Sequence, residues 1–412
     1  MRPNRVGEWL PADQKAVESW LSNLIDEVQS NEQPLHPVID ELRLLIEDDA
    51  QVYMLFHQMF DELPDRPRFF RSPLGTPQVR DYRLMLKLLN AAITRAPKFG
   101  KSMVALPINA ILDWPLGTGA GASAFLNPKV NTQFHKILDQ WARYLGSPES
   151  VSVLNEDPHE GWFGHDAMKA MPNFDEEFIC DPGAPHRGFK SWDAFFTREF
   201  RPGRRPIAVP DDDRVIVNPC ESAPYRLADG VKERDCFWVK SQPYSLIHML
   251  ANDPLARQFI GGTVYQSFLN ALSYHRWHSP VTGKIVKAYR QPGSYYAQAH
   301  TEGLDREGVH DSQAYLTEVA TRAMLFIEAD NPDIGLMCFL AVGMGEVSTC
   351  EIQVTEGQRV KKGEQLGMFH YGGSTQCLIF RPGVRLTFDL HGQKPGTKTE
   401  NILVNARLAT VG

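Results

Sequence analysis

Two short runs in the second half of the chain hold residue types that can do chemistry. Residues 274–280 read Tyr-His-Arg-Trp-His-Ser-Pro, which places His275 and His278 three positions apart. In an extended strand these side chains point to opposite faces, whereas a bend lets both reach one site. Residues 372–375 read Gly-Gly-Ser-Thr, and glycine adds no side-chain hindrance when a following hydroxyl approaches the preceding carbonyl. Each run alone also fits a structural histidine pair or an ordinary turn.

Together and in this order, the two runs resemble motifs of the phosphatidylserine decarboxylase family. The resemblance covers about residues 190–412 and includes three further stretches, residues 195–206, 244–246 and 363–369. Members of that family make a covalent pyruvoyl cofactor from an internal serine. The resemblance therefore implies that the chain cleaves itself directly before Ser374 and that this residue becomes the pyruvoyl group.

The same resemblance implies a role for each residue of the maturation step. His278 takes the proton from Ser374, and Glu221 orients and stabilises the resulting imidazolium, as in a serine-protease triad. The Ser374 oxygen attacks the Gly373 carbonyl, and the resulting ester eliminates. The new dehydroalanine then hydrolyses to pyruvoyl and ammonia.

Two positions depart from the family pattern. The family's Leu-Gly-Ser-Thr motif has leucine where Gly372 stands, and its acid is aspartate where Glu221 stands. The glutamate keeps a carboxylate with one more methylene. Cleavage would give a large chain of residues 1–373 and a small chain of residues 374–412, which we expect to remain associated.

During turnover the substrate amine would form a Schiff base with the pyruvoyl carbonyl, which delocalises the charge left by loss of CO2. By family resemblance, His275 is the candidate for proton transfer, and the unperturbed histidine pKa near 6.5 suits that role. The alternative is a histidine that packs beside the site. Trp277, between the two histidines, is a candidate for an aromatic substrate pocket or for core packing.

Over its whole length the chain resembles more closely a soluble fungal branch of the family that decarboxylates L-tryptophan. The net charge is −7, and no basic amphipathic anchor of the kind that holds peripheral enzymes on a bilayer is evident. We therefore predict decarboxylation of a soluble aromatic L-amino acid, most simply L-tryptophan to tryptamine. The alternatives are a phosphatidylserine decarboxylase that makes phosphatidylethanolamine, and an uncleaved, inactive homologue that acts as a binding module.

Composition excludes several other classes of protein. Hydrophobic residues make up 42% and charged residues 23% of 412 residues, which are ordinary globular values. An acidic chain is a poor nucleic-acid binder because phosphate contacts need clustered positive charge. Six cysteines without a C-x-x-C pair predict reduced thiols in the cytoplasm. His159, His165 and Asp166 lie close in sequence but lack regular ligand spacing, so we predict no metal site.

The elements that must position these residues change in type along the chain. Apolar steps of three and four predict helices within residues 11–60, 79–93, 131–145 and 192–200. Residues 117–125 are rich in glycine but lack the P-loop lysine, so we predict a flexible turn between helices.

Beyond the last of these helices, short β-rich runs alternate with turns. The predicted strands are Arg214–Val217, Cys236–Lys240, Gly262–Leu269, Gly283–Tyr289, Leu336–Val342, Val347–Val354 and Leu386–Leu390. Residues 354–367 also resemble the hairpins of lipoyl carrier domains in architecture. We predict an α+β protein, with a helical N-terminal domain of residues 1–186 and a β-rich, barrel-sandwich-like decarboxylase domain of residues 187–412.

Overall fold

The computed structural model describes residues 14–63, 79–100, 104–235, 244–296, 313–346, 349–371 and 373–412. The chain divides into two compact units that interleave along the sequence. The helical unit comprises Met1–Pro172, Pro182–Phe195 and Ser294–Ser312, and the β-rich unit comprises Asn173–Asp181, Phe196–Gly293 and Gln313–Gly412. The mixed α+β class predicted from the sequence is confirmed.

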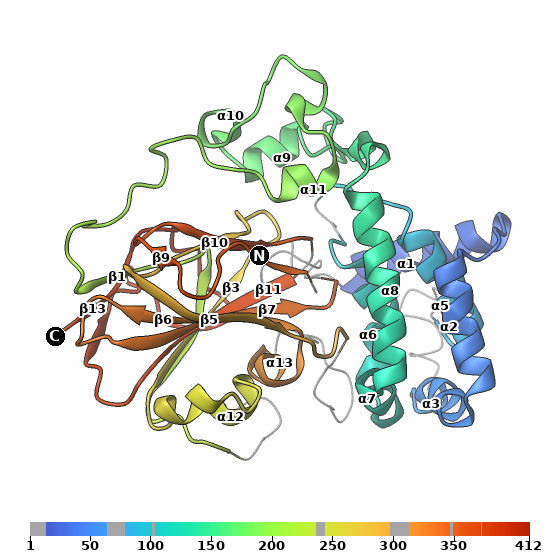
Figure 1. Cartoon of the computed structure of the whole chain (residues 1–412). Helices are drawn as coiled ribbons and strands as arrows, with labels where there is room; N and C mark the ends of the chain where they lie inside the picture. The colour runs from blue at the N-terminus through green and yellow to red at the C-terminus, as the bar shows by residue number, and fades with distance from the viewer. Residues whose placement is uncertain are drawn as a thin grey trace. The chain divides into compact units, whose positions relative to one another are not determined.

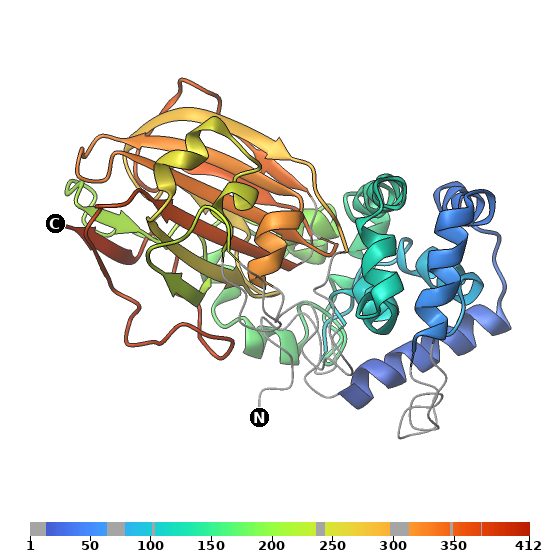
Figure 2. The same ribbon diagram turned by 90° about the horizontal axis from the view of Figure 1, so that it is seen from below.

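The helical unit is built from amphipathic helices whose apolar faces meet in one core. Its helices are α1 (Gln14–Ser30), α2 (Pro37–Asp48), α3 (Ala50–Asp61), α5 (Tyr82–Ala92), α6 (Pro107–Leu116), α7 (Gly119–Leu126), α8 (Pro128–Leu145) and α9 (His165–Ala170), with 3-10 turns at Pro148–Val153 and Pro185–Gly188. Helix α2 packs against α8, and α3 packs against α7 (Figures 1 and 2). The Phe125 ring lies 5.2 Å from Phe134 and 6.1 Å from Phe56, so one aromatic cluster joins three of these helices.

Side-chain caps fix where several of these helices begin. Asp49 accepts hydrogen bonds from the Gln51 and Val52 amides at the start of α3, and Asp81 accepts one from the Leu84 amide at the start of α5. Such caps satisfy amides that have no partner within the helix.

The prediction of a flexible turn at residues 117–125 is wrong, because Gly119–Leu126 forms helix α7. Thr118 caps this helix by accepting from the Gly121 amide. A Cβ atom at Gly121 would lie 1.8 Å from the Pro115 carbonyl oxygen. The glycine therefore allows α7 to start directly against the end of α6, where sequence reasoning predicted a flexible turn.

The helix predicted from Trp192 to Phe200 is shorter than expected. Helix α11 spans only Trp192–Phe196, and Phe200 instead forms an isolated antiparallel bridge with Phe178. The two rings stack at 4.7 Å, so the last apolar residue of the pattern belongs to extended chain.

The β-rich unit contains three antiparallel sheets and no closed barrel among its described residues. The largest has the strand order β2 (Ala223–Ala228), β3 (Thr263–Leu269), β11 (Gly373–Phe380), β7 (Leu336–Met344), β6 (Arg322–Ala329), β5 (Gly283–Gln291) and β9 (Arg359–Val360). The second sheet consists of β1 (Val215–Val217), β13 (Arg407–Val411) and β12 (Leu386–Phe388), and the third of β4 (Arg276–His278), β10 (Gln365–Phe369) and β8 (Cys350–Ile352). Figure 1 shows the central strands of the large sheet running side by side.

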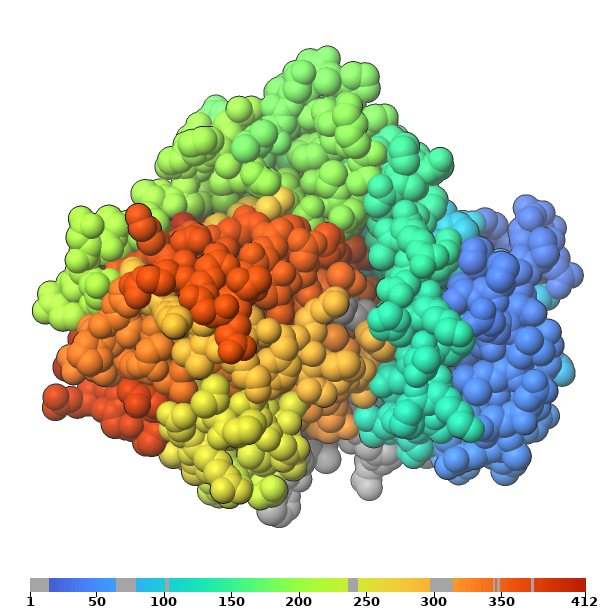
Figure 3. Space-filling model, in the orientation of Figure 1, coloured from blue at the N-terminus to red at the C-terminus, as the bar shows by residue number. Residues whose placement is uncertain are grey.

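Short helices accompany these sheets, namely α10 (Phe174–Glu177), α12 (Leu246–Met249), α13 (Gln313–Val319) and a 3-10 turn at Pro254–Phe259. Near α12, the buried Asp253 carboxylate accepts a hydrogen bond from the Tyr289 hydroxyl at 2.7 Å and pairs with Lys287 of β5. In Figure 3 the yellow segment that contains α12 lies directly against the orange strands.

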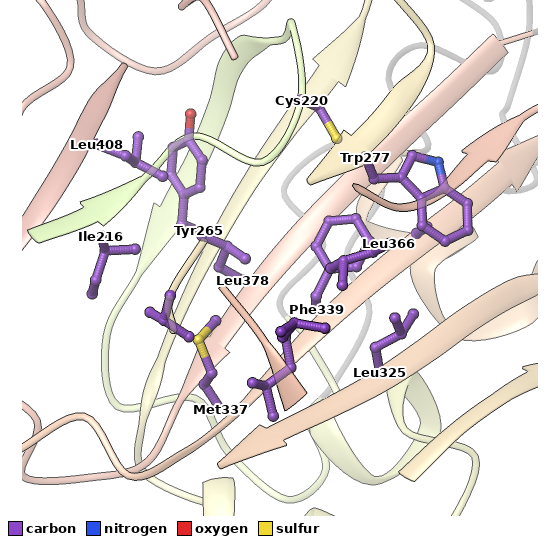
Figure 4. Packing of buried hydrophobic residues seen from close by; sticks show 14 of the residues in the cluster. Ile216, Cys220, Tyr265, Trp277, Leu325, Met337, Phe339, Leu366, Leu378 and Leu408 are labelled. Carbon is purple, nitrogen blue, oxygen red and sulfur yellow. The ribbon is translucent and has the colours of Figure 1, made fainter. Parts of the chain in front are cut away.

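The core of the β-rich unit lies between faces of these sheets. Strand β3 contributes Tyr265 and Leu269, and β11 contributes Leu378 and Phe380. Alternate residues of a strand share a face, so Ser374 of β11 points to the same side as Leu378. Figure 4 shows Trp277 beside Leu366 and Phe339 at one end of this cluster, with Cys220 nearby.

The predicted strands match the structure in part. Six of the predicted runs overlap β1, β3, β5, β7, β8 and β12, whereas Cys236–Lys240 lies outside the described residues. The carrier-like segment forms β9 and β10, joined by a turn in which Gly363 has φ +80°.

Candidate active site

Ser374 lies near the start of the interior strand β11, between β3 and β7. It pairs with Leu269 on one side and with Gly343 on the other, and it is fully buried. Within the part of the chain that the structure describes, its Oγ atom has no hydrogen-bond partner. A buried hydroxyl normally finds a partner, and Ser374 is one of several buried polar groups of the described chain that have none. Its cross-strand neighbour on β7 has no side chain, which leaves space on that side.

A buried polar network runs from β11 to the loop that carries Glu221. Gln376 donates from Nε2 to the Ser267 hydroxyl at 2.6 Å, which donates to the Ser222 hydroxyl at 2.8 Å. Ser222 in turn donates to the Cys220 carbonyl at 3.2 Å. The network lies on the face of β11 that also carries Ser374 and joins that face to the loop of Glu221, although Gln376 Oε1 has no hydrogen-bond partner among the described residues.

A second network holds the residue after Ser374 from the opposite face. The Thr375 hydroxyl donates to the Ser267 carbonyl at 2.8 Å and accepts from Gln266 Nε2 at 3.1 Å. The Tyr244 hydroxyl donates to Gln266 Oε1 at 2.6 Å. All these groups are buried, and the backbone on the C-terminal side of the candidate cleavage site is therefore firmly held.

His278 is held on both ring nitrogens. Nδ1 lies 2.8 Å from the Gly363 carbonyl oxygen, and Nε2 lies 2.9 Å from the Tyr274 hydroxyl. Its backbone N–H donates to the Pro219 carbonyl at 2.8 Å. Burial lowers the pKa of His278 below its ordinary value, the hydrogen bond to the Gly363 carbonyl opposes that fall, and the nearby Arg276 lowers the pKa further.

Glu221 is buried but does not hydrogen-bond to His278. Its Oε1 pairs with Arg205 Nη2 at 2.8 Å, and its Oε2 accepts from the Val404 amide at 2.6 Å. Arg205 also pairs with Glu177. Burial raises the pKa of Glu221, and the ion pair with Arg205 opposes that rise. Glu221 thus binds the segment near residue 404 to the loop that contacts His278.

His275 directly precedes strand β4 and packs among aromatic rings. Its ring lies 3.9 Å from that of Phe196 at an interplanar angle of 23°, and Tyr371 meets Phe196 edge-on at 5.4 Å. The His275 carbonyl accepts from the Phe369 amide. Burial lowers the pKa of His275 well below its ordinary value, and the charge of Arg198 lowers it further. The imidazole is therefore neutral at physiological pH.

Trp277 is fully buried in the hydrophobic cluster of the β-rich unit. Its ring lies 5.3 Å from Phe369 and 5.6 Å from Phe339, and a Cβ atom at Gly367 would come within 2.7 Å of it. This environment favours core packing, the second of the two interpretations of Trp277.

The pyruvoyl group implied by the resemblance fits the residues present. A pyruvoyl group formed at Ser374 would need no separate binding site, and the serine it would come from stands buried in β11. Among the described residues, no group of three or more His, Cys, Asp or Glu side chains is arranged to hold a metal ion. His159 Nδ1 instead lies 3.0 Å from the Asp166 carboxylate.

Comparison with known proteins decides the family. A model described as phosphatidylserine decarboxylase matches residues 192–401, and a second with that description matches residues 36–171. The chain belongs to the phosphatidylserine decarboxylase family. It is 47% identical to decarboxylase iboD of Amanita muscaria over 301 residues, which cover 69% of this chain and 86% of that protein. It is 36% identical to the L-tryptophan decarboxylase of Psilocybe cubensis over 414 aligned positions, covering 94% of this chain and 91% of that protein.

A third relative is named for the decarboxylation of the lipid phosphatidylserine. Phosphatidylserine decarboxylase proenzyme 3 of Schizosaccharomyces pombe is 30% identical over 200 residues, which cover 48% of this chain and 20% of that protein. The relatives named here are all decarboxylases, and this chain is accordingly a carboxy-lyase of that family. None of its described helices is both long and apolar enough to cross a membrane.

Sequence reasoning did not identify several residues of the candidate site. Arg205 belongs to the motif at residues 195–206 without a predicted role of its own, and neither Gly363 nor Tyr274 was predicted to contact His278. Gly363 contributes a backbone carbonyl, which leaves no signal in the residue type. The glycine itself, in a turn with positive φ, was the one available indication.

Proposed function

We propose that this protein is a pyruvoyl-dependent decarboxylase of a soluble aromatic L-amino acid, with L-tryptophan to tryptamine as the first candidate reaction. The observation that carries the chemistry is the buried Ser374 hydroxyl without a partner among the described residues, directly after a glycine, in an interior strand of the large sheet. The substrate rests on relatives named L-tryptophan decarboxylase that align with nearly the whole chain. The proposed compartment is the cytoplasm.

Maturation begins at the Gly373–Ser374 bond. His278 removes the proton from Ser374 Oγ, which attacks the Gly373 carbonyl carbon, and the peptide nitrogen leaves as the ester forms. Elimination of the ester releases the Gly373 carboxylate, and hydrolysis of the resulting dehydroalanine releases ammonia. In this structure Nε2 of His278 lies against the Tyr274 hydroxyl, so that hydrogen bond must break before Nε2 can take the proton of Ser374.

Glu221 takes part in this step as a positioning residue. Its pairing with Arg205 and the Val404 amide anchors the loop whose Pro219 carbonyl accepts the His278 backbone N–H.

The two chains remain associated in this proposal because the small chain supplies interior strands. Strand β11 lies between β3 and β7, and β13 lies between β1 and β12. Separation would expose two rows of backbone groups along β11, each row needing new partners.

In turnover the pyruvoyl carbonyl supplies an electron sink for the charge left when CO2 departs. His275 is the proposed proton carrier at the substrate α-carbon. Because burial lowers its pKa, the neutral ring would have to take up a proton during the reaction before passing it to the α-carbon. His275→Ala is accordingly expected to mature normally and to lose most of its decarboxylation rate.

The substrate proposal is tested by assay of the purified enzyme. Intact mass should show that the 46.5 kDa chain is replaced by chains 1–373 and 374–412, and phenylhydrazine should modify only the small chain. CO2 release is then measured with L-tryptophan, L-phenylalanine, L-tyrosine, L-glutamate and phosphatidylserine vesicles. The non-aromatic acid belongs in the panel because the name of the iboD relative states no substrate.

Each outcome of this assay has a definite meaning. Preference for an aromatic amino acid supports the proposal. Preference for vesicles would make the protein a phosphatidylserine decarboxylase, and preference for L-glutamate would move the substrate class away from aromatic acids. A single uncleaved species would favour an inactive homologue that acts as a binding module.

A further inference from the structure

We propose that Gly363 is a positioning residue for maturation: its carbonyl fixes the His278 ring with the proton on Nδ1 and leaves Nε2 as the basic nitrogen. This inference rests on the proposed self-cleavage. It gives a backbone carbonyl the orienting role that a carboxylate has in a serine-protease triad.

The chemistry of the two ring partners decides which nitrogen carries the hydrogen. A carbonyl oxygen can only accept, so Nδ1 at 2.8 Å from the Gly363 oxygen must carry a hydrogen. In a neutral imidazole Nε2 then has none and accepts the proton of the Tyr274 hydroxyl at 2.9 Å. The low pKa that burial gives His278 agrees with a neutral ring.

The Gly363 carbonyl is held rigidly by its own turn. The Gly363 amide donates to the Ser279 carbonyl at 2.8 Å, and the Ser279 amide donates to the Glu364 carbonyl at 2.7 Å. The Glu364 amide closes the turn onto the Lys361 carbonyl at 3.0 Å. Hydrogen bonds therefore join this turn to the end of the strand that carries His278, on both sides of the ring contact. They fix the direction in which the imidazole ring points.

This position also requires glycine. Gly363 has φ +80°, and a Cβ atom there would lie 2.5 Å from Ile207 Cδ1 and 3.1 Å from Asn405 Oδ1. A side chain there must push these neighbours away or rotate the peptide, and rotation of the peptide moves the carbonyl. Gly357 has a similar φ of +87°, but a Cβ atom added there would meet nothing within 4 Å, so alanine at that position carries the backbone strain alone.

The carboxylate that could orient the ring instead is occupied elsewhere. Glu221 is engaged by Arg205 and by the Val404 amide, and no hydrogen bond joins it to His278 among the described contacts. The direct orienting contact therefore comes from Gly363, while Glu221 acts on the backbone of the same histidine through its loop.

The decisive measurement is the tautomer of His278. In Ser374→Ala protein, which retains the uncleaved chain, nitrogen NMR of labelled histidine should show hydrogen on Nδ1, with the resonance assigned through a His278→Gln variant. Hydrogen on Nε2 would overturn the inference. This readout does not depend on whether the wild-type protein cleaves itself.

A kinetic comparison uses the two glycines. Freshly synthesised Gly363→Ala should cleave itself between about 10- and 100-fold more slowly than wild type, because a small displacement of a reacting group costs that much. Gly357→Ala should cleave within about twofold of wild type, since its strain lies away from the ring. Equal rates for the two variants would overturn the inference.

Tyr274→Phe provides a second variant that retains the ring packed 4.3 Å from Phe200. Loss of a donor to Nε2 removes a bond that stabilises neutral imidazole, so the pH midpoint of self-cleavage should rise. An unchanged midpoint would contradict Nε2 as the titrating nitrogen. Failure of the wild-type chain to cleave would instead overturn the proposed function, whatever the NMR result.

Discussion

The β-rich unit buries some charged side chains much more deeply than the exposed pairs of the helical unit, although it also has exposed pairs of its own. In the helical unit, pairs such as Arg95–Glu27 leave about half of each side chain exposed, at 48% and 51%. In the β-rich unit Glu221 is 6% exposed and Arg322 is 3% exposed. Burial of a charge is costly unless it is paired or hydrogen-bonded, so the β-rich unit must keep its partners in place. Precise positioning therefore belongs to the β-rich unit, and apolar packing dominates the helical unit.

The largest expected effect tests whether chemistry resides in the β-rich unit alone. Ser374→Ala removes the only hydroxyl that the proposal uses as nucleophile, so self-cleavage should be abolished. Ser123→Ala is the matched change on the helical unit, where the exposed hydroxyl only donates to the Gly119 carbonyl. Intact mass should show one uncleaved species for the first variant and two chains for the second.

Two chains from Ser374→Ala, at the sizes of 1–373 and 374–412, would rule out this nucleophile. Loss of cleavage in Ser123→Ala with an unchanged melting midpoint would show that the helical unit takes part in the reaction.

The same contrast explains what the sequence could reveal. Apolar spacing predicted α1 to α3, α5 and α8, because one buried stripe repeats along each helix. It missed α7, since glycine and alanine give little periodic signal where a close approach to Pro115 demands glycine. Strand β11 was missed because it is buried on both faces and lacks polar alternation.

The candidate site was predictable only where a residue type carries its own chemistry. Ser374, His275 and His278 were predicted because the two runs that hold them, in this order, resemble motifs of the decarboxylase family. The partners of His278 were not, because Gly363 lies 85 residues away in the chain and acts through its backbone. The Arg205–Glu221 pair likewise depends on a turn that brings together residues 16 positions apart.

A core substitution in the helical unit should give the next largest effect. Phe125 is 2% exposed and contacts Phe56, Phe134 and Tyr296. Phe125→Ala should lower the free energy of unfolding by about 3–5 kcal/mol through lost burial and a residual cavity. Leu126, the next residue, is 44% exposed, and Leu126→Ala should cost less than about 1 kcal/mol.

Urea unfolding followed by far-ultraviolet circular dichroism measures both variants. Similar losses for Phe125→Ala and Leu126→Ala would contradict a helical unit stabilised by its buried aromatic cluster. Self-cleavage should persist in both variants at temperatures where they remain folded.

A buried carboxyl in the β-rich unit should make stability depend on pH. Burial raises the pKa of Glu318 from 4.5 to about 8, although its Oε1 accepts from the Ser245 amide. The pKa of Glu318 is higher in the folded chain than in the unfolded chain. The stabilisation from this carboxyl is therefore fully present below the unfolded pKa and is lost as the pH rises toward 8. Glu318→Gln keeps an acceptor for the amide and removes the titration.

The variant should therefore gain about 1–3 kcal/mol over wild type between about pH 5 and about pH 8. Glu356→Gln, at an exposed position, is the control and should give a difference near zero. His248 Nδ1 lies 3.7 Å from the Glu318 carboxylate, so the comparison is repeated in His248→Asn protein. A pH-independent difference for Glu318→Gln would show that the carboxyl titrates normally.

The smallest effect is expected for a charge pair of the helical unit. Glu27 binds Arg95 through both carboxylate oxygens, and this pairing lowers the pKa of Glu27. Glu27→Gln should nevertheless change the free energy of unfolding by less than about 1 kcal/mol, because water screens the exposed pair and ordering two long side chains costs entropy. Unfolding in low and high salt should show that even this difference shrinks as salt is added. A loss as large as that from Phe125→Ala would mean that the helical unit, like the β-rich unit, depends on its charged pairs.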